Sequence, residues 1–354
     1  MTQNPQSPFD TAPVRTPRPA SVRTTEPFTN RTPRRISAKT LGAALLIVLM
    51  SFFLLGAGGC GGAEADTCKI RIGLIPTDDN TLFYVADYEN LFAQAGLDVT
   101  FIDFASAPER DAALQARQID GEITDLMTVA LRKKAGIDVA ILTLCLGATP
   151  AEGPFSLIAS PGSGINTQAD LAGAGIGIAE NTIVEYVATR LLDSAGIAAT
   201  DRNFISVPKI PDRLNMVIQG TLAVGAFPEP QSSYAVSQGC IRVIDDTQED
   251  ISQTVFFLTR DLLTSYPNEI KTLMTVLSQA RETYMADPEK YRALITERVK
   301  VPASLVDSYT LPLFSSPQPP LKPNFNDVMN WMTEKNILTR PYTYEDLVDV
   351  SFLS

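Results

Sequence analysis

The sequence predicts an α/β protein with two αβ lobes, and three observations indicate this fold class. From Lys69 onward, short apolar runs alternate with amphipathic helical stretches, a pattern typical of strands covered by helices. The alternation restarts after a Gly/Pro/Ser stretch at 160–164, which suits a crossing between lobes. The length of 354 residues and the apolar content of 45% are sufficient for about two globular domains.

The first part of lobe 1 is predicted at 69–158. Its strands are expected at 69–75, 97–104, 120–124 and 139–147. After the first strand, one helical stripe is formed by Tyr84, Tyr88, Leu91 and Ala95. A second helix is expected at 110–118. Because strands and helices alternate, we expect parallel strands.

Lobe 2 is predicted at 159–246. Further strands are expected at 175–180, 204–209, 223–230, 240–246 and 254–259, with the last two returning to the first lobe. Thr182 and Glu185 have the T-x-x-E spacing of a capping box at the start of a helix. Residues 247–354 are assigned to the return to lobe 1 and to C-terminal helices. No internal repeat is evident in the sequence.

The front of the chain has the features of an export signal. Residues 1–40 form a basic arm rich in Pro, Thr, Arg and Ser, which we expect to be disordered. Residues 41–60 are predicted to be a lipoprotein signal or membrane segment that ends at Cys60, the expected lipidation site. The alternative is a retained membrane helix. Both place the rest of the chain outside the cytoplasm, since the basic flank stays inside.

Composition excludes several classes of function. The chain has no histidine, which removes the commonest general base and metal ligand, so we expect no catalytic residue, metal or cofactor. A net charge of -11, with its basic excess confined to the front, argues against nucleic acid as a partner. No CxxC pair is present. We expect buried thiols, or at most one disulfide, at Cys68, Cys145 and Cys240.

Three motifs carry a resemblance to a known family. They are TLFYVADYENLFAQAGLDVTFIDF, ALQARQIDGEITD and DLAGAGIGIAENTIVEYVATRLLDSAGI. In order and spacing they resemble periplasmic solute-binding proteins of ABC importers, in the nitrate, sulfonate and thiamine-precursor group, over about residues 69–350. Arg117 stands where this group usually has Gly. The resemblance implies a type II periplasmic-binding-protein fold, whose two lobes close on a small molecule in a cleft and deliver it to a membrane permease without catalysis.

Candidate ligand-binding residues follow the predicted strands, because ligands of open αβ folds bind beyond the carboxyl ends of the strands. They are Asp79, Asn80, Tyr84, Phe104, Ser106, Asp125, Asn181, Thr182, Tyr186 and Glu229. Asp79, Asn80 and Thr182 are equally suited to capping helices. The aromatic side chains are equally suited to the core.

The charges near these positions favour one class of solute. Carboxylates predominate, and Lys209 and Arg213 are the nearby cations, so we expect a heteroaromatic or amine-bearing solute such as a thiamine-precursor pyrimidine. The alternative ligand is a sulfonate or nitrate-type anion, held by Arg213 and the helix start at Asn181–Thr182. The alternative functions are the extracellular sensor domain of a membrane receptor and, less favoured, an enzyme that uses carboxylates. We expect a monomer whose partners are the solute, the permease and membrane lipid.

Overall fold

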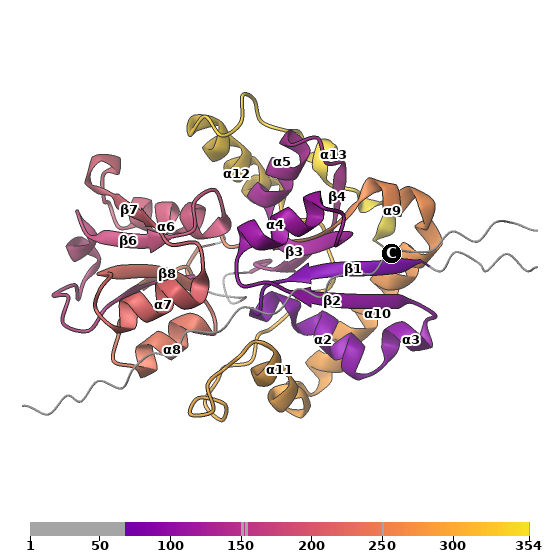
Figure 1. The fold of residues 1–354 in the computed structure, drawn as a ribbon, viewed down its shortest axis with the longest axis horizontal. Helices are drawn as coiled ribbons and strands as arrows, with labels where there is room; N and C mark the ends of the chain where they lie inside the picture. Colours follow the sequence, from indigo (N-terminus) through magenta and orange to yellow (C-terminus); the bar gives the residue numbers. More distant parts are fainter. Residues whose placement is uncertain (1–67, 150–151, 153–154, 250, 354) are drawn as a thin grey trace, which may run out of the picture. The chain divides into compact units, whose positions relative to one another are not determined.

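The computed structural model describes residues 68–149, 152, 155–249 and 251–353. This part of the chain contains two five-stranded sheets with helices packed against them (Figure 1). None of its helices combines the length and the apolar character that a membrane crossing requires. The predicted basic arm, the segment 41–60 and the lipidation site Cys60 lie outside the described residues.

The first sheet has the strand order β2-β1-β3-β10-β4. These strands are β1 (Lys69–Leu74), β2 (Asp98–Asp103), β3 (Gly121–Asp125), β4 (Val139–Leu146) and β10 (Thr254–Thr259). The helices that precede the first crossing are α2 (Thr81–Tyr88), α3 (Leu91–Gln94), α4 (Ala107–Gln115) and α5 (Leu126–Lys134). The C-terminal helices are α9 (Arg260–Ser265), α10 (Pro267–Ala286), α11 (Arg292–Arg298), α12 (Lys322–Glu334) and α13 (Tyr344–Leu347).

The second sheet has the strand order β7-β6-β8-β5-β9. These strands are β5 (Phe155–Ala159), β6 (Gly175–Ile178), β7 (Asn203–Ser206), β8 (Val224–Pro228) and β9 (Ile241–Asp245). Its helices are α6 (Ile183–Ser194), α7 (Ile210–Ile218) and α8 (Gln231–Ser237). β9 therefore stays in the second sheet, and only β10 of the last two predicted strands returns to the first.

Both sheets are mixed, which corrects the prediction of parallel strands. β10 runs antiparallel to β3 and β4, and β5 runs antiparallel to β8 and β9. Each of these strands is the first after the chain passes from one sheet to the other. Because β5 pairs with β8, the second sheet begins at Phe155, ahead of the predicted boundary at 158/159. A fully buried apolar strand carries no mark of its direction.

The two sheets share one internal arrangement. In the first, Ile72 and Gly73 of β1 are paired with Gly121 and Glu122 of β3. In the second, Ile176 and Gly177 of β6 are paired with Val224 and Gly225 of β8. In both sheets, the strand that lies between two parallel neighbours thus pairs with one of them at an Ile-Gly dipeptide. The fold contains a structural repeat that the sequence analysis does not predict.

Two local predictions need correction. The stripe from Tyr84 to Ala95 is not one helix, because Asn90 adopts a left-handed conformation with φ of 59° between α2 and α3. Tyr88 is consequently 62% exposed.

Thr182 does cap α6 and accepts a hydrogen bond from Val184 N at 3.2 Å. Glu185 does not complete the capping box; its Oε2 accepts from Asn181 N at 2.8 Å instead.

The C-terminal segment links both halves of the molecule. Phe325, Val328 and Trp331 of α12 belong to the same apolar cluster as Val187 and Leu191 of α6. The α2 and α10 helices belong to a second cluster beneath β1. The first cluster thus joins helices that accompany different sheets, and the burial of this apolar surface is a main source of the stability of their contact.

Candidate functional site

One open pocket is lined by both halves of the molecule. It encloses about 820 Å³, part of it continuous with solvent. The segments after β1 and β3 and the start of α4 line it from the first half, and the starts of α6 and α7 and the end of β8 line it from the second. Antiparallel strands contribute their first residues, because Thr254 is paired with Asp125 and Phe155 with Pro228. The pocket therefore lies at the edge where ligands of αβ folds bind.

Arg213, the fourth residue of α7, is a fully buried member of the lining. Its Nε donates to Ala226 O at 3.1 Å, and its Nη1 donates to Val207 O at 2.6 Å. Its Nη2 has no hydrogen-bond partner, and no carboxylate lies within ion-pair distance of it among the described residues. Burial lowers the pKa of Arg213 to about 10, so the side chain remains a cation at neutral pH. Arg213 thus presents an uncompensated positive charge with an unused donor.

Arg110, the fourth residue of α4, is the other arginine in the lining. Its Nε lies 3.0 Å from Glu122 Oε2. Its Nη1 donates to Ile123 O and its Nη2 to Thr124 Oγ1, both at 2.6 Å. Glu122 is fully buried, and burial raises the pKa of its carboxyl to about 7. The charge of Arg110 is therefore matched within the protein.

Arg110 and Arg213 occupy equivalent places in the repeat. Each is the fourth residue of its helix, and each donates to the carbonyl of the third residue of the neighbouring strand. The second residue of that strand is Glu122 in β3 but Gly225 in β8. The fourth residue is Thr124 in β3 but Phe227 in β8, and the Arg213 Cζ lies 5.2 Å from the centre of the Phe227 ring. The second half therefore lacks both side-chain acceptors that hold Arg110.

The start of α6 is less available to an anion than the sequence predicts. Ile183 N donates to Asp125 Oδ2 at 3.2 Å, a contact between the two halves. Val184 N donates to Thr182 Oγ1, and Asn181 N to Glu185 Oε2. Since these N–H groups already have partners, the helix start is not a free anion site in this structure.

Carboxylates also line the pocket. Asp78 is 5% exposed; its Oδ2 accepts a hydrogen bond from the Tyr309 hydroxyl, and its Oδ1 has no partner. Burial, together with the negative charges of Glu229 and Asp79, raises the pKa of Asp78 to about 7, against the lowering effect of the hydrogen bond from Tyr309. Glu229 accepts from Arg242 Nη2 at 2.7 Å and from Ser233 N at 3.1 Å. Asp79 accepts from Thr77 Oγ1 at 2.7 Å.

The structure brings half of the predicted residues together. Five of them line the pocket: Asp79, Ser106, Asp125, Thr182 and Glu229. Asp125 also caps α5, because its Oδ1 accepts from Thr128 N at 2.7 Å. Asp125 therefore combines the capping of a helix with a place in the pocket.

The other five predicted residues do not line this pocket. Asn80 is buried and donates through Nδ2 to Ile75 O. The ring of Tyr84 packs edge-on against Phe101, and Phe104 is partly buried against the core. Asn181 is exposed, with φ of 58°. Asn80, Tyr84 and Phe104 thus pack within the protein. Their sequence pattern does not reveal this, because the period of a helix or strand does not distinguish the core from a pocket wall.

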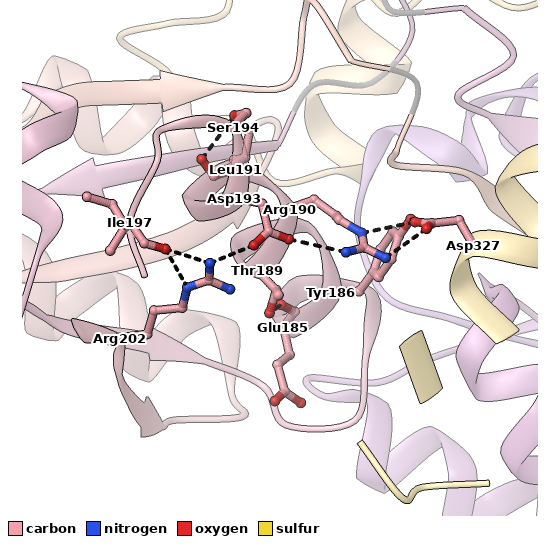
Figure 2. Close-up of polar contacts among 10 residues, drawn as sticks. All are labelled: Glu185, Tyr186, Thr189, Arg190, Leu191, Asp193, Ser194, Ile197, Arg202 and Asp327. Atoms are coloured by element: carbon pink, nitrogen blue, oxygen red, sulfur yellow. Dashed lines mark hydrogen bonds and ion pairs between the residues drawn. The ribbon is translucent and has the colours of Figure 1, made fainter. Parts of the chain in front are cut away.

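Tyr186 points away from the pocket toward the C-terminal helix. Figure 2 shows Tyr186 and Arg190 of α6 directed at Asp327 of α12. The Tyr186 hydroxyl donates to Asp327 Oδ2, and Arg190 Nε and Nη2 bind both oxygens of Asp327 at 2.9 and 2.8 Å. Tyr186 thus belongs to a contact that fastens α6 to α12.

Sequence reasoning missed Arg110, Ser252 and Thr254 in the lining. Ser252 and Thr254 precede or begin an antiparallel strand, whereas the predicted ligand-binding residues were placed after strands. A signal for Arg110 does exist: α4 begins with APER and α7 with IPDR, the same Pro-acid-Arg pattern at the same helical positions. Comparing the two helix starts would have identified the equivalent arginines.

Cysteines and metal ligands do not form a further centre in the described part of the chain. Cys68, Cys145 and Cys240 are free thiols, so no disulfide joins them. Within the described ranges, no group of three or more Cys, Asp or Glu side chains has an arrangement that could hold a metal ion.

Comparisons with known proteins agree with this architecture. A ligand-binding component of an ABC-type import system from Staphylococcus aureus, with zinc bound, has a TM-score of 0.69 at 14% identity and covers 80% of this chain and 97% of its own. The periplasmic aliphatic sulphonate binding protein SsuA from Escherichia coli has a TM-score of 0.67 at 18% identity, with coverage of 79% and 97%. The desulfurization enzyme DszB has a TM-score of 0.61 at 11% identity, with coverage of 80% and 98%.

These similarities show the type II periplasmic-binding-protein fold. Among curated protein sequences, none is recognisably similar to the chain. The model of the NMT1/THI5-like family matches residues 78–291, which include the second sheet, all strands of the first sheet except β1, and the residues that line the pocket from α4, α6 and α7. The chain therefore belongs to the NMT1/THI5-like family.

Proposed function

We propose that this protein is the extracytoplasmic solute-binding component of an ABC importer, and that its solute carries an anionic group bound by Arg213. The family, the fold and a pocket lined by both halves support this function. The solute is captured between the two lobes, near residues 69–158 and 247–354 on one side and 159–246 on the other, and is delivered unchanged to the permease. Lipidation of Cys60, or a retained helix at 41–59, holds the monomeric protein at the membrane.

The observation that carries the choice of ligand is the unused donor of Arg213. A buried charge is strongly unfavourable unless a counter-charge accompanies it. Arg213 Nη2 has no partner among the described residues, and the equivalent position to Glu122 is Gly225. A sulfonate or another oxyanion in the pocket would supply both the counter-charge and the missing acceptor. The aliphatic sulphonate bound by the Escherichia coli neighbour is consistent with this class.

The predicted heteroaromatic solute has less support. Tyr84 and Tyr186 engage structural partners, and Phe155 is the aromatic side chain that lines the pocket among the described residues. A single ring offers a stacking surface on one face only, whereas ring-binding sites typically combine several apolar and aromatic contacts. We therefore propose the anion in place of the ring.

Catalysis is not part of the proposal. The chain has no histidine to act as a general base, although one structural neighbour is an enzyme. Fold similarity alone does not decide between binding and catalysis. Recovery of the bound solute in unchanged form, measured by mass spectrometry after incubation with the full-length chain, is the expected result; conversion of the solute would contradict it.

The test is calorimetric titration of the purified full-length chain with propane-1-sulfonate and with nitrate. We expect saturable binding of at least one anion, and Arg213→Met should weaken it by about 100-fold or more, because a charged hydrogen bond in a desolvated pocket is lost. The affinity of Arg213→Lys should lie between those of the native chain and Arg213→Met, since lysine keeps the charge but lacks the planar guanidinium. Arg260→Met, at a partly exposed arginine in α9, is the matched control. Equal affinity in Arg213→Met and the native chain would overturn the assignment.

A further inference from the structure

The helix α12 lies beyond the residues that the family model matches, and it is held to the first half of the molecule. The Phe325 ring of α12 packs edge-on against the Tyr344 ring of α13, with 5.2 Å between the ring centres. The α13 helix packs in turn on α5 and on β4 of the first sheet. Just beyond α12, Ile337 O accepts a hydrogen bond from Lys134 Nζ of α5. Because these partners belong to the first half, α12 moves with that half.

The same helix is fastened to α6 of the second half. Asp327 binds Arg190 through both carboxylate oxygens, at 2.9 and 2.8 Å, and accepts a hydrogen bond from the Tyr186 hydroxyl (Figure 2). About one turn further along α12, the Trp331 ring packs edge-on against the Tyr186 ring, with 5.6 Å between the ring centres. One helix of the first half thus makes both polar and aromatic contacts with one helix of the second.

Much of this contact is buried. Tyr186 is 2% exposed, Trp331 3% and Glu185 4%. Lys335, directly after α12, forms an ion pair with Glu185. Separating α12 from α6 would return two aromatic rings to water and break two ion pairs, one of them at a buried carboxylate, and each of these changes is unfavourable. We call this contact the clasp; its members are Asp327, Trp331 and Lys335 on one side and Glu185, Tyr186 and Arg190 on the other.

The halves are joined more weakly between α4 and α7. Lys209 Nζ, immediately before α7, lies 3.0 Å from Glu109 Oε1 in α4. The two side chains are 51% and 42% exposed, and an ion pair that is exposed to this extent contributes little to stability and is screened by salt. Among the described residues, this is the ion pair that joins α4 directly to α7. Separation of the halves therefore requires less free energy between α4 and α7 than at the clasp.

We infer that the clasp holds α6 and α12 together in the solute-free protein and confines the separation of the halves to a narrow opening between α4 and α7. The inference goes beyond the proposed function, because it concerns the chain without solute and does not depend on which solute is bound. A clasped chain stays close to the arrangement that binds the solute. The binding-competent population is therefore larger, and the apparent affinity higher, than in a chain whose halves separate freely.

The experiment measures two distances in the solute-free, full-length chain by pulsed electron spin resonance. The spin labels are attached to non-canonical amino acids, so that the native thiols stay unlabelled. One pair, at Gln115 of α4 and Asn215 of α7, reports the opening. The other pair, at Ser194 of α6 and Asn330 of α12, reports the clasp. All four positions are exposed. In the native chain we expect a narrow distance distribution for both pairs.

Removal of both ion pairs tests the clasp. In the double variant Asp327→Asn with Lys335→Met, we expect both distributions to broaden and the mean opening distance to increase by more than about 2 Å, the scale of a domain rearrangement. Asp327→Glu, which keeps the charge, should remain closer to the native chain. The matched control is Glu345→Gln with Lys322→Met, which removes an ion pair between α12 and α13 within the first half and should leave both distances unchanged. Thermal unfolding verifies that each variant is folded.

The outcomes decide the inference without reference to the solute. A native opening distribution as broad as that of the double variant would overturn it, as would an unchanged clasp distance in the double variant. If the double variant does not fold, Lys335→Met alone, at an exposed lysine, replaces it with a smaller expected broadening. Narrow distances that depend on the clasp support the inference even if sulfonates do not bind, and saturable binding of sulfonates supports the proposed function even if the clasp is wrong.

Discussion

Arg110 and Arg213 lie at the same position in the two halves of the molecule, yet only one of them has its charge matched. Glu122 and Thr124 of β3 hold Arg110, whereas Gly225 and Phe227 of β8 stand beside Arg213. The same helix start and the same carbonyl contact are present in both halves. The comparison shows that the neighbouring strand, and not the arginine, decides whether a buried guanidinium serves stability or is left for a ligand.

The neighbouring strands also decide how much space is available around the two arginines. A Cβ atom on Gly73 would lie 2.9 Å from Arg110 Cγ, and one on Gly177 would lie 3.2 Å from Arg213 Cγ. Both glycines therefore make room for an arginine stem over the central strand. At Gly225, a Cβ atom would lie 2.5 Å from the Phe227 ring. The packing of Phe227 thus keeps any side chain, including a carboxylate, out of the position that Glu122 occupies in the other half.

The largest expected contrast is in stability. Arg110→Met leaves Glu122 buried without a partner, and breaking such a pair typically costs about 3–5 kcal/mol. Arg213→Met removes a charge that has no partner, so only its hydrogen bonds to two carbonyls are lost, at about 1 kcal/mol each. Urea unfolding of the full-length variants at pH 8 without solute measures both. Equal losses of unfolding free energy in the two variants would refute the comparison.

A smaller effect is expected from the strand residue that holds Arg110. Thr124→Val removes the Oγ1 acceptor of Arg110 Nη2 and leaves a charged donor unpaired in a buried place, which costs about 1–3 kcal/mol. Thr264→Val, at an exposed threonine of α9, should be almost neutral and serves as the control. Urea unfolding measures the effect as a change in the midpoint concentration, while the slope of unfolding free energy against urea concentration stays constant. An unchanged midpoint in Thr124→Val would show that Thr124 does not help to hold Arg110.

The last effect is gradual and concerns the pH dependence of the free energy of unfolding. Burial raises the pKa of Glu122 from its ordinary 4.5 to about 7, so between these values the folded chain retains a proton that the unfolded chain releases. Stability contributed by this group is complete below about pH 4.5 and falls as the pH rises toward 7, by at most about 1.4 kcal/mol per pH unit. Glu122→Gln should flatten the slope of unfolding free energy over this window. An unaltered slope would contradict the shifted pKa.

Much of the fold can be predicted from the sequence, because periodicity reports burial directly. The runs at 69–75, 139–147 and 254–259 become β1, β4 and β10 with shifts of two residues at most. Strand direction cannot be predicted in this way, since β5 and β10 have the same apolar character whether they run parallel or antiparallel. The first residue of β10, Thr254, consequently lies at the pocket although it does not follow a strand.

The pocket is less predictable for a second reason. Asp125 and Thr182 were identifiable because a polar residue after a strand is expected at the ligand edge. Tyr84 and Tyr186 satisfy the same rule and yet point into the protein, because an aromatic ring is suited to either environment. The charge of Arg213 is unmatched because position 225 is a glycine and not a carboxylate. A contact that is missing between two segments far apart in the sequence produces no local sequence pattern.

The contact between α6 and α12 has a consequence for biosynthesis. Asp327 binds Arg190 and Tyr186 across 137 and 141 residues of sequence, and the same two helices share an apolar cluster. A chain that emerges N-terminus first presents α6 long before α12, and at about 5–20 residues per second the interval is on the order of ten seconds. During that interval the apolar face of α6 lacks its partner. The second half of the molecule is therefore the part most dependent on protection from aggregation until the C-terminal helices have been made.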